Sequence, residues 1–106
     1  MITDNVTAAL DSAEIPNFKE GGLDEHYPFF VMLEKAQTAN VNGFWRQRYN
    51  LHLVFGENDD CDALEKLVID TLRKNANCFV IDAISPLRRD EELEIDVITI
   101  RVVLYP

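Results

Sequence analysis

An amphipathic segment in the middle of the chain, Asp60–Asn75, constrains the fold most. Its apolar residues recur at intervals of three and four, which places them on one face of an α-helix, with charged residues on the other. The residues of the predicted buried stripe are Leu64, Leu67, Val68, Thr71 and Leu72. A helix with one apolar face needs a partner surface, so the rest of the chain has to supply a surface against which the stripe packs.

Polar residues mark both ends of this predicted helix. Asp59, Asp60 and Asp62 stand at its start, where carboxylates accept hydrogen bonds from free backbone N–H groups. Asn75 or Asn77 can adopt the left-handed conformation that ends a helix. We therefore interpret the acidic cluster as a helix cap. A calcium loop needs a different spacing of acids and a glycine within the loop, not before it.

The surface that the helix needs is predicted to be a β-sheet. Four segments alternate or carry mainly apolar residues, as strands do, namely Phe29–Lys35, Phe44–Phe55, Cys78–Ser85 and Leu93–Tyr105. The clearest is Phe44–Phe55, in which Tyr49, Leu51 and Leu53 form one face. The last segment is long for a small domain, so the part before Val97 is expected to project as a hairpin arm with the end of the third strand.

The remaining segments are expected to be one short helix and three connections. Thr3–Ala13 carries a narrow apolar stripe, and Pro16 is expected to stop it. Asn17–Pro28 is predicted to be a loop, Gln37–Gly43 a polar hairpin turn ending in Asn-Gly, and Leu87–Glu92 a charged loop.

These elements predict an α+β fold with the order α-β-β-α-β-β and a single domain spanning residues 1–106. We expect a four-stranded antiparallel sheet with both helices on the face that carries Tyr49, Leu51 and Leu53. The opposite face is expected to mix Val and Ile with polar residues, which are Arg46, Arg48, His52, Thr99 and Arg101. That mixture is too polar for a core and too apolar for a surface that contacts only solvent, so we expect this face to contact another subunit.

The charge balance argues against nucleic acid as a partner. The chain has a net charge of -9, whereas neutralising phosphates requires clustered Lys and Arg. Arg46 and Arg48 beside Trp45 superficially resemble an aromatic and basic nucleic-acid platform, but nineteen carboxylates surround them, and an intersubunit salt-bridge face is favoured. We also expect no membrane association, because no apolar run is long enough and no signal peptide opens the chain.

The potentially reactive residues do not form a recognisable catalytic or metal-binding pattern. Cys61 and Cys78 are 17 residues apart, in neither a CxxC nor a paired metal spacing. His26 and His52 are expected to be a loop residue and a residue of the sheet face. A helix start favours a reactive Cys61 thiolate, whereas the neighbouring aspartates oppose it. We therefore expect no enzyme activity, no cofactor and no bound metal.

The layout resembles one protein family over nearly the whole chain. An amphipathic N-terminal helix precedes a YPFFVML strand (Tyr27–Leu33) and an RQRYNLHLVF strand (Arg46–Phe55). The DCDALEKLVIDTLRKN helix and a final strand that ends in ITIRVVLYP (Ile98–Pro106) follow. In this order the elements are similar to those of the phage and prophage tail terminator family, also called tail-completion or head–tail joining proteins.

The resemblance implies a structural virion assembly protein without an active site. Members form a ring, commonly a hexamer, that caps the tail tube and offers a docking surface for the head connector. The expected partners are therefore further copies of the chain, the tail tube protein and the head connector protein. The expected location is the virion tail, after assembly in the cytoplasm of a bacterial host. An acidic balance would suit a channel through which DNA passes without adhering.

The family offers no residue motif to transfer, so candidate subunit contacts come from the predicted sheet. They are Arg46, Arg48, His52, Arg101, Arg88 and Arg89. Three alternatives remain open beside the ring. One is a cytosolic α+β binding or regulatory module, and another is a different head–tail connector or minor tail protein. The third is a small enzyme, which would need a cleft that gathers Cys61, a histidine and a carboxylate.

Overall fold

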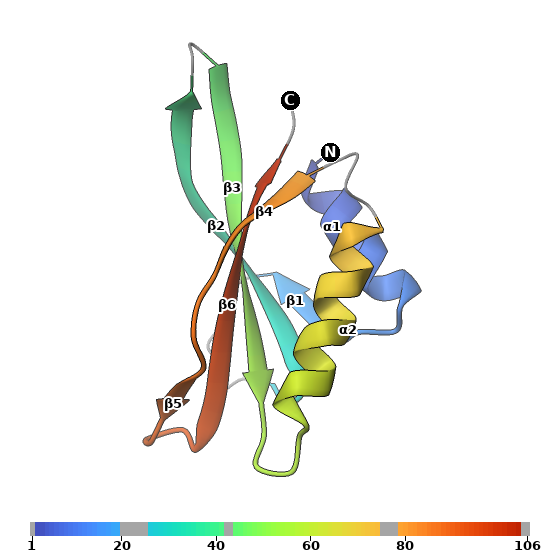
Figure 1. Ribbon diagram of the computed structural model, residues 1–106, viewed down its shortest axis with the longest axis vertical. Helices are drawn as coiled ribbons and strands as arrows, with labels where there is room; N and C mark the ends of the chain where they lie inside the picture. The colour runs from blue at the N-terminus through green and yellow to red at the C-terminus, as the bar shows by residue number, and fades with distance from the viewer. Residues whose placement is uncertain (1, 20–25, 42–43, 75–78, 105–106) are drawn as a thin grey trace.

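The computed structural model describes residues 2–19, 26–41, 44–74 and 79–104. The fold is α+β, with two helices beside a six-stranded mixed sheet (Figure 1). In chain order the elements are α1 (Ile2–Ser12), β1 (Asn17–Lys19), β2 (Phe30–Val41), β3 (Phe44–Phe55), α2 (Cys61–Arg73), β4 (Phe79–Ile84), β5 (Arg88–Asp90) and β6 (Ile95–Leu104). Neither helix in this part of the chain is long and apolar enough to cross a lipid bilayer.

The sheet differs from the predicted one in strand number and direction. Its order is β1-β2-β3-β6-β4, with β5 also paired to β6, and β1 runs parallel to β2. The prediction of four antiparallel strands was therefore wrong. The two additional strands lie in Asn17–Pro28 and Leu87–Glu92, which were expected to be loops. Each has only three residues, and β5 contains no apolar residue, so neither produces an alternating pattern.

The β2–β3 hairpin is longer than the sequence indicated. β3 has the predicted bounds, but β2 continues to Val41, because the polar stretch that was expected to turn pairs its backbone with β3. Backbone pairing needs no apolar side chains, which is why composition misplaced the strand end. The Asn42-Gly43 turn lies outside the described residues. The hairpin extends well past both helices (Figure 1).

Both helices pack on the predicted face of the sheet, here called the inner face. Tyr49, Leu51 and Leu53 lie there in one buried cluster with residues from both helices and the other central strands. The members from α1, α2, β2 and β6 include Val6, Leu10, Val31, Leu33, Val68, Leu72, Ile98, Ile100 and Val102. The main core therefore lies between one face of the sheet and the helix pair.

One residue of the predicted helix stripe was misplaced. Val68, Thr71 and Leu72 are buried as expected, but Leu67 is 43% exposed. Successive helix residues are about 100° apart, so Leu67 lies at the edge of a contact face that is centred on Val68. The sequence pattern gives the arc of apolar residues, but the angle at which the helix sits on the sheet decides which edge is covered.

The N-terminal end of α2 is capped by a side chain, whereas the C-terminal end of α1 is capped by the backbone. Asp60 caps α2 as predicted, because its Oδ1 accepts a hydrogen bond from Ala63 N at 3.1 Å. Asn75 and Asn77, the candidates for its C-terminal end, lie outside the described residues. α1 ends through Glu14, whose φ of 58° is left-handed, and Ile15 N donates to Leu10 O at 2.9 Å. This Schellman-type cap ends the helix before the proline that was expected to stop it.

The other face of the sheet, the outer face, carries a second apolar cluster at one end. It comprises Phe30, Met32, Val54, Ile95 and Val97, against which Leu93 packs. The part of β6 before Val97 pairs with β5 and not with the third predicted strand, so the expected hairpin arm was assigned the wrong partner. That third strand is β4, and Cys78 at its predicted start lies outside the described residues.

Candidate functional site

Four of the six predicted interface residues lie together on the outer face. The β-sheet register sets His52 beside Thr99, and Arg101 between Asn50 and Ala83. Arg48 lies one row further along β3, opposite Val103, and Arg88 lies opposite Val97 on β6. Arg48, His52, Arg88 and Arg101 are called the arginine face below.

Thr99 holds two of these side chains in place. Its Oγ1 accepts a hydrogen bond from Arg88 Nη2 at 2.8 Å and lies 2.9 Å from His52 Nδ1. The Thr99 backbone N donates to Ser85 Oγ at 2.9 Å, and Ser85 N donates to Thr99 O at 2.8 Å. Arg88 is therefore attached to the sheet through a neutral hydroxyl, which leaves its charge without a direct counter-ion in this contact.

Several polar groups on the arginine face have poor partners. His52 Nε2 lies 3.4 Å from Glu34 Oε2, within ion-pair range, yet it is buried and its geometry does not make a hydrogen bond. Arg48 Nε is also buried without a hydrogen-bond partner. Arg101 Nη1 reaches Asp82 Oδ2 only at 3.5 Å, and both side chains are well exposed. A buried polar nitrogen without a hydrogen-bond partner costs free energy, so Arg48 and His52 are held on this face at a local cost in stability.

A shallow hollow of about 380 Å³ opens on this face. Its lining combines six hydrogen-bonding side chains with two apolar ones, namely Asn50, His52, Ala83, Ile84, Ser85, Arg88, Thr99 and Arg101. Two guanidinium groups with amide and hydroxyl groups around them suit a carboxylate, because arginine pairs with carboxylates through two parallel hydrogen bonds. The hollow is therefore chemically suited to an acidic side chain of a partner.

The other two predicted interface residues do not join this group. Arg46 has its backbone in β3, but its side chain lies outside the described residues. Arg89 pairs with Asp96, and Arg89 Nη1 lies 3.6 Å from Asp96 Oδ1. Since Asp96 lies opposite Phe55, whose side chain belongs to the inner face, Arg89 points to the helix side of the sheet. Strand alternation thus places Arg88 and Arg89 on opposite faces of the sheet, although the sequence analysis assigned both to one charged loop.

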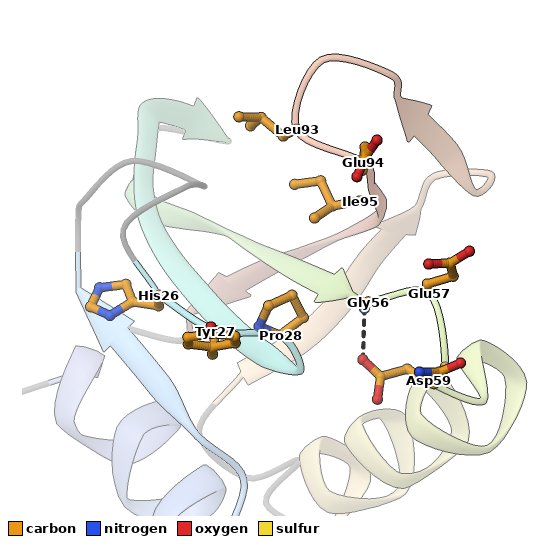
Figure 2. Close-up of a pocket in the computed structure, with 10 residues that line it drawn as sticks. His26, Tyr27, Pro28, Gly56, Glu57, Asp59, Leu93, Glu94 and Ile95 are labelled. Carbon is orange, nitrogen blue, oxygen red and sulfur yellow. Dashed lines mark hydrogen bonds between the residues drawn. The ribbon is translucent and has the colours of Figure 1, made fainter.

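A second surface feature was missed by the sequence analysis. A groove of about 600 Å³ lies at the end of the sheet, where β3 leads into α2 and β6 begins (Figure 2). Its lining residues are His26, Tyr27, Pro28, Gly56, Glu57, Asn58, Asp59, Leu93, Glu94 and Ile95. It is called the acidic groove, because its described lining includes three carboxylates and neither lysine nor arginine. It joins three segments distant in sequence, so no local pattern could have shown it.

Local hydrogen bonds hold the walls of the acidic groove. Asp59 Oδ2 accepts from Gly56 N at 2.6 Å, which fixes the turn that leads into α2. A Cβ on Gly56 would come within 3.2 Å of Pro28 Cβ, so glycine permits the close approach of these two segments. On the opposite wall, Asp90 Oδ1 accepts from Glu92 N and Leu93 N, both at 3.1 Å. That bonding shapes the turn on which Glu94 stands.

The remaining candidates have structural surroundings. The His26 ring stacks on Phe18 with a centroid distance of 3.6 Å, and both rings meet Phe30 edge-on. Partial burial, followed by the charges of Asp96 and three aspartates near the start of α2, raises the pKa of the Cys61 thiol above its usual value. A raised pKa disfavours the nucleophilic thiolate at neutral pH. Within the described ranges, no three His, Cys, Asp or Glu side chains cluster closely enough to hold a metal ion.

Comparison with known proteins adds no family assignment. No model of a known protein family matches the sequence. No curated protein matches it with significant similarity either. The resemblance to tail terminator proteins therefore stands on the order and pattern of the elements.

Proposed function

We propose that this chain is a structural virion assembly protein that closes into a ring, with six copies as the expected number, at the end of a phage tail tube. The ring would halt growth of the tube and present the surface to which the head connector binds. One observation carries the proposal: an acidic protein places the side chains of three of its six arginines on one sheet face that neither helix covers. These arginines are Arg48, Arg88 and Arg101.

The arginine face supports self-association because its exposed guanidinium groups have only weak contacts within the chain. Arg88 donates to the neutral Thr99 hydroxyl, and Arg101 Nη1 lies 3.5 Å from Asp82 Oδ2 between exposed side chains. A neighbouring subunit can supply carboxylates to these groups, and the gain is largest where water is excluded. Charged groups on an otherwise half-apolar surface also fix the register between partners, which a ring requires.

The β2–β3 hairpin supports the same proposal through its backbone. Among the described residues, β3 has no pairing to β6 beyond Arg48, and β1 pairs with Val31–Leu33 of β2 alone. The outer part of the hairpin is therefore a two-stranded ribbon in the described structure, and such ribbons are marginally stable alone in water. A neighbouring subunit or the tail tube would provide the surface that stabilises it.

The test is the mass of the assembled species, measured by light scattering across protein and salt concentration and followed by negative-stain imaging. We expect closed rings, in free solution or on polymerised tail tube protein from the same source. Arg48→Glu should weaken assembly without unfolding the chain, whereas Lys66→Glu, an equal charge change on the exposed side of α2, should leave it intact. A chain that stays monomeric in both settings would contradict the proposal.

A second candidate function follows from the acidic groove. A concavity of about 600 Å³ is within the range of small-molecule sites, so a stand-alone binding or regulatory module is the alternative. That function predicts a stable monomer or dimer that does not bind tail tubes. The same mass measurement therefore separates the two proposals.

A further inference from the structure

We propose that the arginine face of one copy docks into the acidic groove of the next copy, so that the contact joins two different surfaces of the same chain. The inference rests on the proposed function and deepens it, since it names the interface that closes the ring. Only a contact between two different surfaces produces a ring of more than two subunits from one kind of interface.

The acidic groove has the composition of a receptor for a guanidinium group. Glu57 and Glu94 are exposed, and neither has an ion-pair partner among the described residues. Tyr27, which is 94% exposed, lies across the groove from them (Figure 2). A planar guanidinium can stack on such a ring and donate to a carboxylate at the same time. Leu93, which is only partly buried, adds apolar surface that the stem of an arginine can cover.

The described lining of the groove includes no lysine or arginine. Asp59 already accepts a hydrogen bond from a backbone N–H, and the one basic-type side chain among the described lining residues, His26, stacks on Phe18. Carboxylates that share one concavity repel each other, and a cation from outside relieves that repulsion. The occupant is therefore expected to carry arginine or lysine.

The arginine face supplies a matching surface. Arg88 donates to the neutral Thr99 hydroxyl, and the Arg101–Asp82 contact is long and exposed to water, where ion pairs contribute little. Each guanidinium has five N–H donors, so both arginines keep donors for a partner. The hollow between them is in turn suited to a carboxylate, which the rim of a second groove offers.

The two surfaces can be used at the same time. The residues that line the acidic groove and those that line the hollow on the arginine face do not overlap. One copy can therefore present its groove to one neighbour and its arginine face to another, as a closed ring requires. Complementary charge also speeds encounter and disfavours contacts between like surfaces.

The test removes the charges from each surface separately. The groove variant combines Glu57→Gln with Glu94→Gln, and the face variant combines Arg88→Gln with Arg101→Gln. Controls with equal charge changes on α2 are Glu65→Gln with Asp70→Asn, and Lys66→Gln with Arg73→Gln. Circular dichroism checks that every variant folds, and assembly is measured wherever the unaltered chain assembles, in solution or on polymerised tail tube protein.

We expect the groove variant and the face variant each to weaken assembly by about tenfold or more, while both controls assemble normally. An equimolar mixture of the groove and face variants should form a one-to-one pair and no larger species, because one intact groove meets one intact face. Native mass spectrometry measures that pair directly.

Two results would overturn the inference while the proposed function stands. Normal rings from either variant would show that these charges do not form the interface. Loss of assembly in both variants without a pair in the mixture would show that the surfaces do not bind each other. If the unaltered chain forms no ring in either setting, the proposed function itself fails, and the inference fails with it.

Discussion

The inner and outer faces are built from alternate residues of the same strands, yet they differ in what covers them. Leu51 and Leu53 on the inner face are fully buried under the two helices. Between them, His52 faces outward and lies among polar neighbours. The outer face is itself divided, because Phe30 and Val54 at one end are fully buried without a helix above them. Whether a side chain on this sheet is buried thus depends on which residues pack over it as well as on strand alternation.

The largest loss of stability is expected when one phenylalanine is replaced on each face, which tests whether both faces are buried. Phe55 belongs to the inner cluster and Phe30 to the outer one, and both are fully buried. Phe55→Ala and Phe30→Ala are each expected to lower the free energy of unfolding by about 3–5 kcal/mol, because each leaves a large cavity. Denaturant unfolding of the monomer measures both.

Equal losses would establish that the chain has two cores, one on each face. A loss below about 1 kcal/mol for Phe30→Ala would mean that the outer cluster is a surface patch, since exposed substitutions usually have effects of that size or less. The comparison between the faces would then reduce to one buried face and one open face.

A second test uses two leucines of the same helix. Leu72 is buried against the inner face, whereas Leu67 is 43% exposed. Leu72→Ala is expected to cost about 2–5 kcal/mol in unfolding free energy, and Leu67→Ala much less, because little of its surface leaves water on folding. Both substitutions keep helix propensity high, so the difference reports packing. Similar losses at the two positions would show that α2 is rotated relative to the described packing.

How far the sequence predicted this fold depended on the length of each pattern. The twelve-residue alternation of β3 and the acid-capped α2 gave the α+β class, the inner face and the Asp60 cap. β1 and β5 have three residues each, and they are strands because β2 and β6 offer edges to pair with. Such pairing depends on distant segments, which a local pattern cannot report.

The candidate site also divides into a part that local sequence patterns predict and a part that depends on distant segments. Alternation along β3 and β6 placed Arg48, His52 and Arg101 on one face from the sequence alone. It could have separated Arg88 from Arg89 as well, had the segment been recognised as a strand. The acidic groove could not be predicted from the sequence, because Tyr27, Glu57 and Glu94 come together only after the sheet forms.

A third test weakens the polar part of the outer face. Thr99→Val keeps a β-branched side chain but removes the hydroxyl that contacts Arg88 and His52. We expect a loss of about 1 kcal/mol, mainly because His52 is largely buried whereas Arg88 can turn to water. Thr99→Ser retains the hydroxyl and is the control, with a smaller loss in thermal or denaturant unfolding. Equal losses for the two variants would mean that the hydroxyl contributes no more to stability than the methyl group that Thr99→Ser removes.

The smallest expected effect on stability is at Arg101. A change in assembly after substitution at this position can therefore be separated most clearly from a change in folding. Its contact with Asp82 is 3.5 Å long between exposed side chains, so Arg101→Gln should change the unfolding free energy by no more than about 0.5 kcal/mol. Unfolding of Arg101→Gln measured beside its assembly therefore separates the two faces: a large loss of stability would make Arg101 part of the fold, and unchanged stability with weakened assembly would make the outer face an interface.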